Sequence, residues 1–178
     1  MLRRKAAKVA KIDASIQRLV DDMIDSMHAA GGVGLAAPQI GRSLRIVVIE
    51  MPPAVAAGEP ASPADGPASP EEKPETIVLI NPQIVRRSGH REVTEGCLSV
   101  PGYWADITRS RKVTAKGLDR DGREIRVKGE DLLAQALEHE VDHINGVLYV
   151  DYLESTDQLR KAEPHEEEDL SEVAQAGP

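Results

Sequence analysis

The segment "ALEHEVDHINGVLYVDYL", residues 136–153, constrains the fold more than any other part of the sequence. It places His139 and His143 four positions apart, and Glu140 follows the first histidine directly. In an α-helix, residues four apart are roughly 40° apart around the axis and share one face. Both imidazoles can therefore bind one metal ion, and we predict a helix that begins at residue 130 or 131 and ends at residues 145–146.

Glu140 lies beside the two histidines on this helix rather than on the same line. A carboxylate in that position can take a proton from water activated by a metal and later deliver it to a leaving nitrogen. This is the His-Glu-x-x-His pattern of metallohydrolases. Three fixed residues also arise by chance, and the alternative is an exposed helix with two ordinary histidines.

Two protein ligands do not hold a catalytic metal firmly, and Cys97 is the candidate for the third. It is the single cysteine of the chain and lies in "TEGCLSVPGYW", residues 94–104, before an expected turn at residues 100–102. A thiolate and two imidazoles leave a fourth position open for water, as in catalytic sites. The alternative is a small buried apolar side chain, the usual role of a lone cysteine. One cysteine forms no internal disulfide, which favours a reducing, cytoplasmic location.

A glycine-rich stretch, "GGVGLAAPQIG" at residues 31–41, is the third candidate for chemistry. Its glycines suggest a backbone that passes close to another group. No Lys or Ser/Thr follows as a phosphate-binding loop requires, so that function is excluded. The amide of Gln39 could stabilise the oxygen of a tetrahedral intermediate, and the alternative is a plain connecting loop. The other histidines have no partner at ligand spacing and are expected at the surface: His28, His90 and His165.

The length of 178 residues predicts one domain with a core of its own. Because aromatic residues make up 2% and phenylalanine is absent, the core must consist of Leu, Ile, Val, Ala and Met. Apolar residues at helical spacing predict a helix over residues 13–30, with Asp13 or Ser15 as its cap. We further expect strands at 44–50 and 76–81, a hairpin at 112–129 that turns near residues 121–122, and a last strand at 147–150.

Residues 51–76 contain seven of the twelve prolines and almost no large apolar side chain. They are expected to form a mobile insertion, with a docking segment for a proline-recognising partner as the alternative. We assign residues 1–155 to the domain and 156–178 to a disordered tail; residues 162–178 hold six acidic residues and no Lys or Arg. The tail is expected to be solvated, or more rarely a partner contact. The net charge of −8 argues against a nucleic-acid footprint over the whole domain. No segment has the length of a membrane span or the pattern of a secretory signal.

Three motifs in order resemble those of the peptide deformylases: "GVGLAAPQ" (32–39), "EGCLS" (95–99) and "HEVDH" (139–143). All three together, with the lone cysteine in the second, are highly specific. The similarity continues through "RIVVIE", "LINP" (79–82), "LDRDG" (118–122) and "NGVLYVDYL" (145–153), and covers roughly residues 2–155 apart from the proline-rich insertion. Members usually carry a further segment ahead of the position at which this chain begins.

The resemblance implies a compact α+β domain in which antiparallel strands surround the His-Glu-x-x-His helix. It implies hydrolytic removal of the N-formyl group from the N-terminal formylmethionine of new proteins, with release of formate. The partner would be a nascent polypeptide, met near the ribosome, without direct contact to nucleic acid or membrane. By motif position, Cys97, His139 and His143 would bind the metal, Glu140 would be general base and acid, and Gln39 with the Leu98 N–H would stabilise the oxyanion. Backbone groups would bind the extended substrate: Val33, Gly34 and Gly96.

The metal implied by the resemblance is one Fe²⁺ per chain, with Zn²⁺, Ni²⁺ or Co²⁺ as substitutes. The ligand types alone would favour Zn²⁺. We also expect Asp142, on the same side of the helix as the ligands, to pair with Arg109. We further expect Val33, Ala136 and Leu137 to line the methionine pocket, with Gln135 and Trp104 at its rim.

Two other functions compete with a deformylase. A metalloendopeptidase of the general His-Glu-x-x-His type would cleave internal peptide bonds, but such zinc enzymes typically use a third His or Glu rather than Cys. A non-catalytic interaction protein would act through the proline-rich and acidic segments, but no ligand or base of the site is missing from the sequence.

Overall fold

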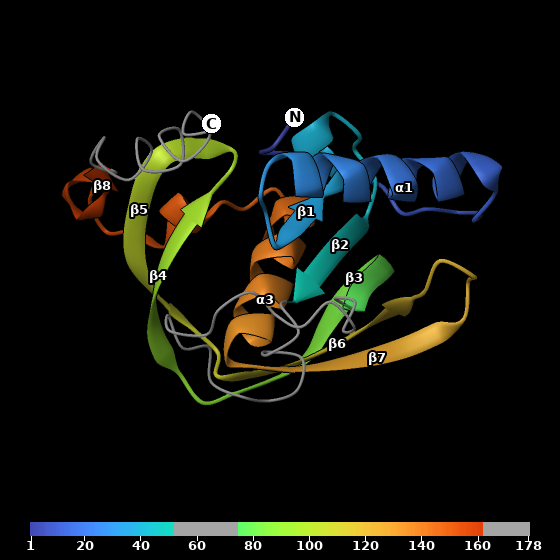
Figure 1. The fold of residues 1–178 in the computed structure, drawn as a ribbon. Helices are drawn as coiled ribbons and strands as arrows, with labels where there is room; N and C mark the ends of the chain where they lie inside the picture. Colours follow the sequence, from blue (N-terminus) through green and yellow to red (C-terminus); the bar gives the residue numbers. More distant parts are fainter. Residues whose placement is uncertain (52–74, 162–178) are drawn as a thin grey trace, which may run out of the picture.

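The computed structural model describes residues 1–51 and 75–161 (Figure 1). Most of the expected insertion and all of the acidic stretch at 162–178 lie outside these residues. In the described part of the chain, no helix is long and apolar enough to cross a membrane.

The described part of the chain consists of helices and antiparallel strands. The helices are α1 (Ala14–Ala29), α3 (Asp131–Asn145) and the 3₁₀ helices η1 (Ala37–Ile40), η2 (Tyr149–Tyr152) and η3 (Thr156–Gln158). The strands are β1 (Gly34–Ala36), β2 (Ile46–Met51), β3 (Glu75–Ser88), β4 (Arg91–Cys97), β5 (Val100–Arg109), β6 (Lys112–Leu118), β7 (Glu124–Glu130) and β8 (Arg160–Lys161).

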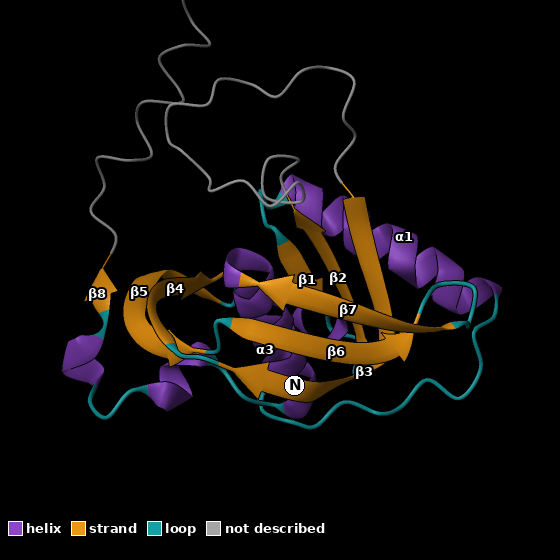
Figure 2. Ribbon diagram, turned by 90° about the horizontal axis from the view of Figure 1, so that it is seen from below, coloured by secondary structure: helices purple, strands orange, loops and turns teal. Residues whose placement is uncertain are grey.

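Two antiparallel sheets enclose α3, which confirms the expected α+β fold. The larger sheet has the order β1-β2-β3-β6-β7, and the smaller has the order β4-β5-β8. Figure 1 shows α3 between them, with β4 and β5 on one side and β6 and β7 beneath. Figure 2 shows the long strands β3, β6 and β7 from below, side by side. One edge of each sheet, β1 and β4, is therefore left unpaired next to α3.

The core is aliphatic, as the composition requires. One cluster joins α3 to the large sheet through Ala134, Leu137 and Ile144. A second lies beneath α1, whose buried face repeats at helical spacing: Ile16, Leu19, Val20, Met23 and Met27. Asp13 caps this helix by accepting hydrogen bonds from the backbone N–H groups of Ser15 (2.9 Å) and Ile16 (3.3 Å), so the first of the two cap candidates is confirmed.

The expected strands at 44–50 and 76–81 and the hairpin at 112–129 are present, although β3 is longer than its apolar run. Its pairing with β6 shifts in register between Ile80 and Gln83, where Asn81 has a φ of 55°. The Asn81 side chain donates to the carbonyl of Val9 and accepts from its N–H, each at 2.9 Å. The bulge therefore fixes the N-terminal segment to the sheet. The β6–β7 hairpin turns through Gly122 at φ 83°, as predicted.

Three sequence-based expectations differ from the structure. Residues 147–150 do not form a strand: after Gly146 (φ 79°), the N–H of Leu148 donates to the Asp151 carboxylate at 2.8 Å and a 3₁₀ turn follows. The turn after Cys97 comes at residues 98–99, and residues 100–102 already belong to β5. Residues 156–161, which we placed in the tail, form η3 and β8, and β8 pairs with Tyr103 and Trp104 of β5.

Candidate active site

Three side chains from two elements converge on one point. The Sγ of Cys97 and the Nε2 of His139 each lie 3.2 Å from the Nε2 of His143. All three ligand atoms lie within 4.8 Å of one another. Ligands at about 2.0–2.3 Å from one tetrahedral ion are roughly 3.3–3.7 Å apart. The two separations of 3.2 Å are close to these values, and the donor set of one sulfur and two imidazole nitrogens fits a divalent transition metal.

Local structure explains how the ligands meet. His139 and His143 occupy adjacent turns of α3, and Cys97 is the last residue of β4. Side chains alternate across a strand, so Cys97 and Glu95 point to the same side of β4, toward the helix. Glu95 is 3% exposed, and its Oε1 contacts the Nδ1 of His139. This contact orients the ring and leaves its Nε2 free to bind a metal.

Behind the ligands lies a buried network of charges. Arg109, at the end of β5, donates to both oxygens of Glu95 at 2.9 Å and to the Oδ2 of Asp142 at 2.6 Å. Tyr152 donates to the same Asp142 oxygen at 2.9 Å, and its ring lies 4.7 Å from the guanidinium carbon. The expected contact between Asp142 and Arg109 is thus present. Burial disfavours the charge of Arg109, yet its two carboxylate partners raise its pKa.

Glu140 is buried beside the ligands without a hydrogen-bond partner. It is 4% exposed, and its Oε2 has no donor among the described residues. Burial raises its pKa to about 7, and the neighbouring charges of Glu95 and Asp142 raise it while His139 lowers it. Gly34 permits this position, because a Cβ there would lie 2.6 Å from the Glu140 Oε1. A carboxyl group with such a pKa can accept and release a proton near neutral pH.

The two histidines have opposite electrostatic environments. Burial lowers the pKa of His139, but Cys97, Glu95 and Glu140 outweigh it and raise the pKa to about 10. Burial and the charge of His139 lower the pKa of His143 to about 3. His143 is therefore neutral, whereas the neighbouring acidic groups favour the protonated form of His139. A bound metal ion would replace the proton on His139.

Gln39 is oriented by its own backbone. Its Oε1 accepts from the N–H of Ala36 at 2.7 Å, so its NH₂ must point the other way. That NH₂ lies 3.3 Å from the Ser99 Oγ and 3.9 Å from the Cys97 Sγ. A hydrogen-bond donor therefore faces the site from η1.

A cleft of about 490 Å³ opens above the cluster, between the edge strands β1 and β4. The predicted site residues on its walls are Val33, Gly34, Gln39, Gly96, Cys97, Leu98, His139 and Glu140. His143 is 2% exposed and lies beneath the cleft rather than on its wall. Of the expected pocket residues, Ala136, Gln135 and Trp104 also line it. Leu137 does not: it is fully buried in the core cluster.

Sequence reasoning missed Glu95 and Tyr152. Glu95 precedes Cys97 by two residues, and strand alternation could have placed both on one face. That inference required a strand where the sequence suggested a loop. Tyr152 carries no local signal, because its contact with Asp142 depends on the 3₁₀ turn of η2.

Comparison with known proteins points to a single family. A family model described as polypeptide deformylase matches residues 1–159. A peptide deformylase of Dehalococcoides mccartyi is 51% identical over 167 residues, covering 94% of this chain and 89% of the relative. One from Thermomicrobium roseum is 45% identical over 174 residues, covering 97% and 91%.

Solved structures show the same fold. The peptide deformylase of Ehrlichia chaffeensis superposes with a TM-score of 0.76 at 38% identity, covering 88% of this chain and 84% of that one. The enzyme of Legionella pneumophila gives a TM-score of 0.73 at 40% identity, covering 99% and 93%. The family model, the relatives and the solved structures agree, and the chain belongs to the polypeptide deformylase family.

Proposed function

We propose that Cys97, His139 and His143 hold one divalent metal ion and that Glu140 moves the protons of the reaction. The reaction itself follows from the family: the chain is a hydrolase that removes the N-formyl group from new polypeptides. One observation supports this assignment of residues: three ligand atoms converge below a cleft. The carboxylate of Glu140, which has no hydrogen-bond partner among the described residues, lines the same cleft.

The ligand set suits Fe²⁺, the metal that the family resemblance implies, and Zn²⁺, Ni²⁺ or Co²⁺ could replace it. When bound, the ion supplies Lewis acidity that makes water a nucleophile near neutral pH. Glu95 supports this role through the Nδ1 of His139.

Glu140 acts first as a base and then as an acid. Its unpaired oxygen accepts a proton from the attacking water, and the same carboxyl group later protonates the leaving amine. Burial supports both roles, because it raises the carboxyl pKa to about 7.

The developing negative charge on the formyl oxygen requires donors. We assign this role to the Gln39 amide, which faces Cys97, and to the backbone N–H of Leu98, which follows Cys97 directly. Removal of one such donor typically costs about 10²–10³ in kcat.

The substrate binds as an extended chain between two sheet edges. Gly34 belongs to edge strand β1 and Gly96 to edge strand β4, and edge strands bind peptides through their free backbone groups. The carbonyl of Val33 already accepts from the Glu50 N–H at 2.9 Å. The side chain of Val33 is 44% exposed on the cleft wall. Together with Ala136 it can contact the methionine side chain of the substrate. We expect the substrate to be met as a nascent chain near the ribosome.

The test is formate release from a formyl-methionyl tripeptide by oxygen-free protein loaded with Fe²⁺. The unformylated tripeptide, analysed for internal cleavage, separates a deformylase from an endopeptidase. We expect formate without backbone cleavage, and none from metal-free protein. Cleavage of the peptide backbone would contradict the proposal. So would a His139→Ala variant that has lost the metal and still releases formate at the wild-type rate.

A further inference from the structure

The outer face of the large sheet carries a group of cations that the reaction does not use. Arg86 on β3, Lys116 on β6, and Arg126 and Lys128 on β7 are all exposed. We call these four residues the basic sheet face. They lie on the side of the sheet away from α3, because the alternate residues of β6, such as Val113, are buried in the core beneath that helix.

The register of the strands brings these cations together. Lys116 lies directly opposite Arg126 in the β6–β7 pair. In the next row, Thr114 is flanked by Arg86 on one side and Lys128 on the other. Residues directly opposite share a face and have Cβ atoms about 4.5–5.5 Å apart, and like charges there are destabilising. The strand pairing alone therefore gives this arrangement no advantage.

Acidic residues do not neutralise the basic sheet face within the described part of the chain. None of the four cations forms an ion pair there, whereas Lys112, on the same face of β6, pairs with Glu130 at 2.9 Å. On β7, Glu124 lies two residues from Arg126 and Glu130 lies two residues from Lys128, where it pairs with Lys112. The excess positive charge is confined to the middle of the sheet.

A cavity adjoins these cations. It has a volume of about 580 Å³ and lies where β3 bulges away from β6. Lys116 and Arg126 line it together with Lys8 of the N-terminal segment, and its other walls are Ile80, Asn81, Gln83, Gly117, Leu118, Glu124 and Ile125. Three cations thus surround one hollow, against a single carboxylate.

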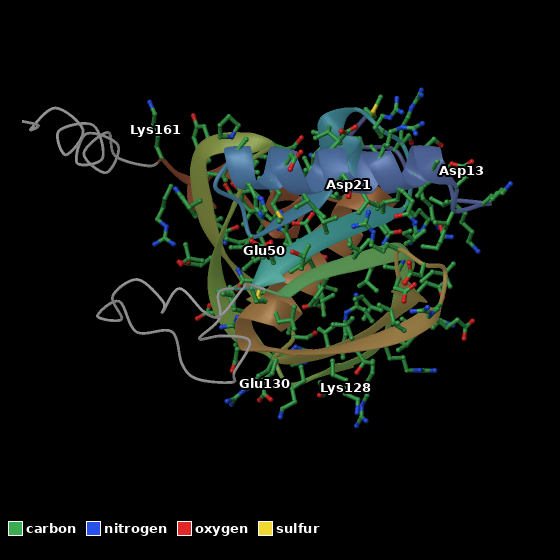
Figure 3. All side chains as sticks on the ribbon, turned by 45° about the vertical axis from the view of Figure 1, so that its right-hand side comes forward. Asp13, Asp21, Glu50, Lys128, Glu130 and Lys161 are labelled. Carbon is green, nitrogen blue, oxygen red and sulfur yellow. The ribbon has the colours of Figure 1, made fainter. Side chains whose placement is uncertain are left out.

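The basic sheet face is separate from the catalytic cleft. In Figure 2 the strands β3, β6 and β7 lie in front of α3 in a view from below. Figure 3 shows Lys128 pointing away from the body of the protein. The metal-binding cluster lies on the other side of the sheet, on α3 and β4. An occupant of this face would leave the cleft open to a peptide.

We infer that the basic sheet face binds the phosphate backbone of a structured RNA. Lysine and arginine side chains are the groups that contact phosphates, and such contacts fix orientation without reading sequence. The paired strands there, Lys112–Leu118 and Glu124–Glu130, contain no aromatic side chain on which unpaired bases could stack, so a helical backbone fits better than a single strand. The choice of RNA over DNA rests on the proposed function, because new polypeptides emerge beside RNA.

The whole-chain charge of −8 does not describe this surface. Ten of the thirty acidic residues lie at positions 52–74 and 162–178, with only one of the twenty-two basic residues. The described part of the chain is thus nearly neutral, and a local group of cations dominates the field near it.

The experiment measures binding of the full chain to a fluorescently labelled RNA hairpin between about 50 and 200 mM KCl. Each phosphate neutralised contributes about −0.7 to −0.9 to the slope of log K against log salt, so four side chains predict a slope near −3. Arg86→Ala, Lys116→Ala, Arg126→Ala and Lys128→Ala combined should reduce the slope to between 0 and about −1. Lys116→Ala alone should reduce its magnitude by about one.

Lys112→Ala is the matched control, because its charge lies on the same strand and face but is already paired with Glu130. It should leave affinity within about twofold and the slope unchanged. Formate release by each variant is measured in parallel, so that loss of fold or of deformylase activity is seen separately from loss of RNA binding. We expect all variants to keep the formate-release rate.

Three outcomes would overturn the inference. The wild-type chain could fail to bind the hairpin at low salt, the combined variant could bind as the wild type does, or polyglutamate could bind as tightly as RNA at equal charge. The last result would identify the face as a site for acidic protein segments.

Discussion

At the scale of single residues, the site depends on a carboxylate that is buried but not hydrogen-bonded. The Oε2 of Glu140 has no partner among the described residues. In Glu140→Gln the amide keeps the shape but accepts no proton, so kcat should fall at least about 10²-fold while metal binding persists. Steady-state formate release with metal analysis of the same sample checks this. Equal loss of metal and activity would instead assign Glu140 a structural role.

A substitution at Gly34 tests whether the position of the Glu140 carboxylate matters. In Gly34→Ala the new Cβ would lie 2.6 Å from the Glu140 Oε1 and must displace it. A shift of about 1 Å at a reacting group can cost roughly 10²-fold in rate. Gly32→Ala is the matched control, because its Cβ would meet the movable Leu98 Cδ1 at 3.2 Å. Equal kcat values for the two variants would show that Glu140 adapts.

At the scale of elements, one buried arginine joins β4, β5 and α3. Arg109 is 3% exposed and binds both Glu95 and Asp142. Arg109→Met leaves two buried carboxylates without their cation, so the free energy of unfolding should fall by about 3–5 kcal/mol. Denaturant unfolding measures this. Arg123→Met, which removes an exposed pair with Asp121, should change it by less than about 0.5 kcal/mol; similar losses in both variants would exclude a special role for the buried network.

The elements also show which parts of the fold and site the sequence could predict. Helices α1 and α3 carry long periodic patterns and caps, and both were predicted close to their observed bounds. Residues 147–150 have the composition of a strand, but they pair with no strand among the described residues, and Tyr149 instead donates to the Tyr103 carbonyl at 2.9 Å. Glu95 was missed because the sequence suggested a loop where β4 lies, and its contacts join positions 44 and 14 residues apart.

At the scale of the molecule, a metal would tie the two sheets together. Cys97 comes from the small sheet, and His139 and His143 come from the helix packed on the large one. A ligand held about 10³-fold above its dissociation constant stabilises the folded state by about 4 kcal/mol, or roughly 10 °C in Tm here. Thermal unfolding with excess Fe²⁺ and with a chelator measures this. His143→Ala should abolish the difference; a difference that persists would place the metal elsewhere.

The N-terminal segment packs against the C-terminal end of α3, the helix that carries the site. The N–H of Ala6 donates to the carbonyl of Ile144 at 2.9 Å, and a Cβ on Gly146 would lie 2.8 Å from the backbone of Arg3. The end of α3 is therefore complete only when residues 3–6 and 144–146 have come together. Contacts between such distant positions slow folding. During synthesis the helix that carries the site should therefore be completed late, once residues near positions 6 and 144 can meet.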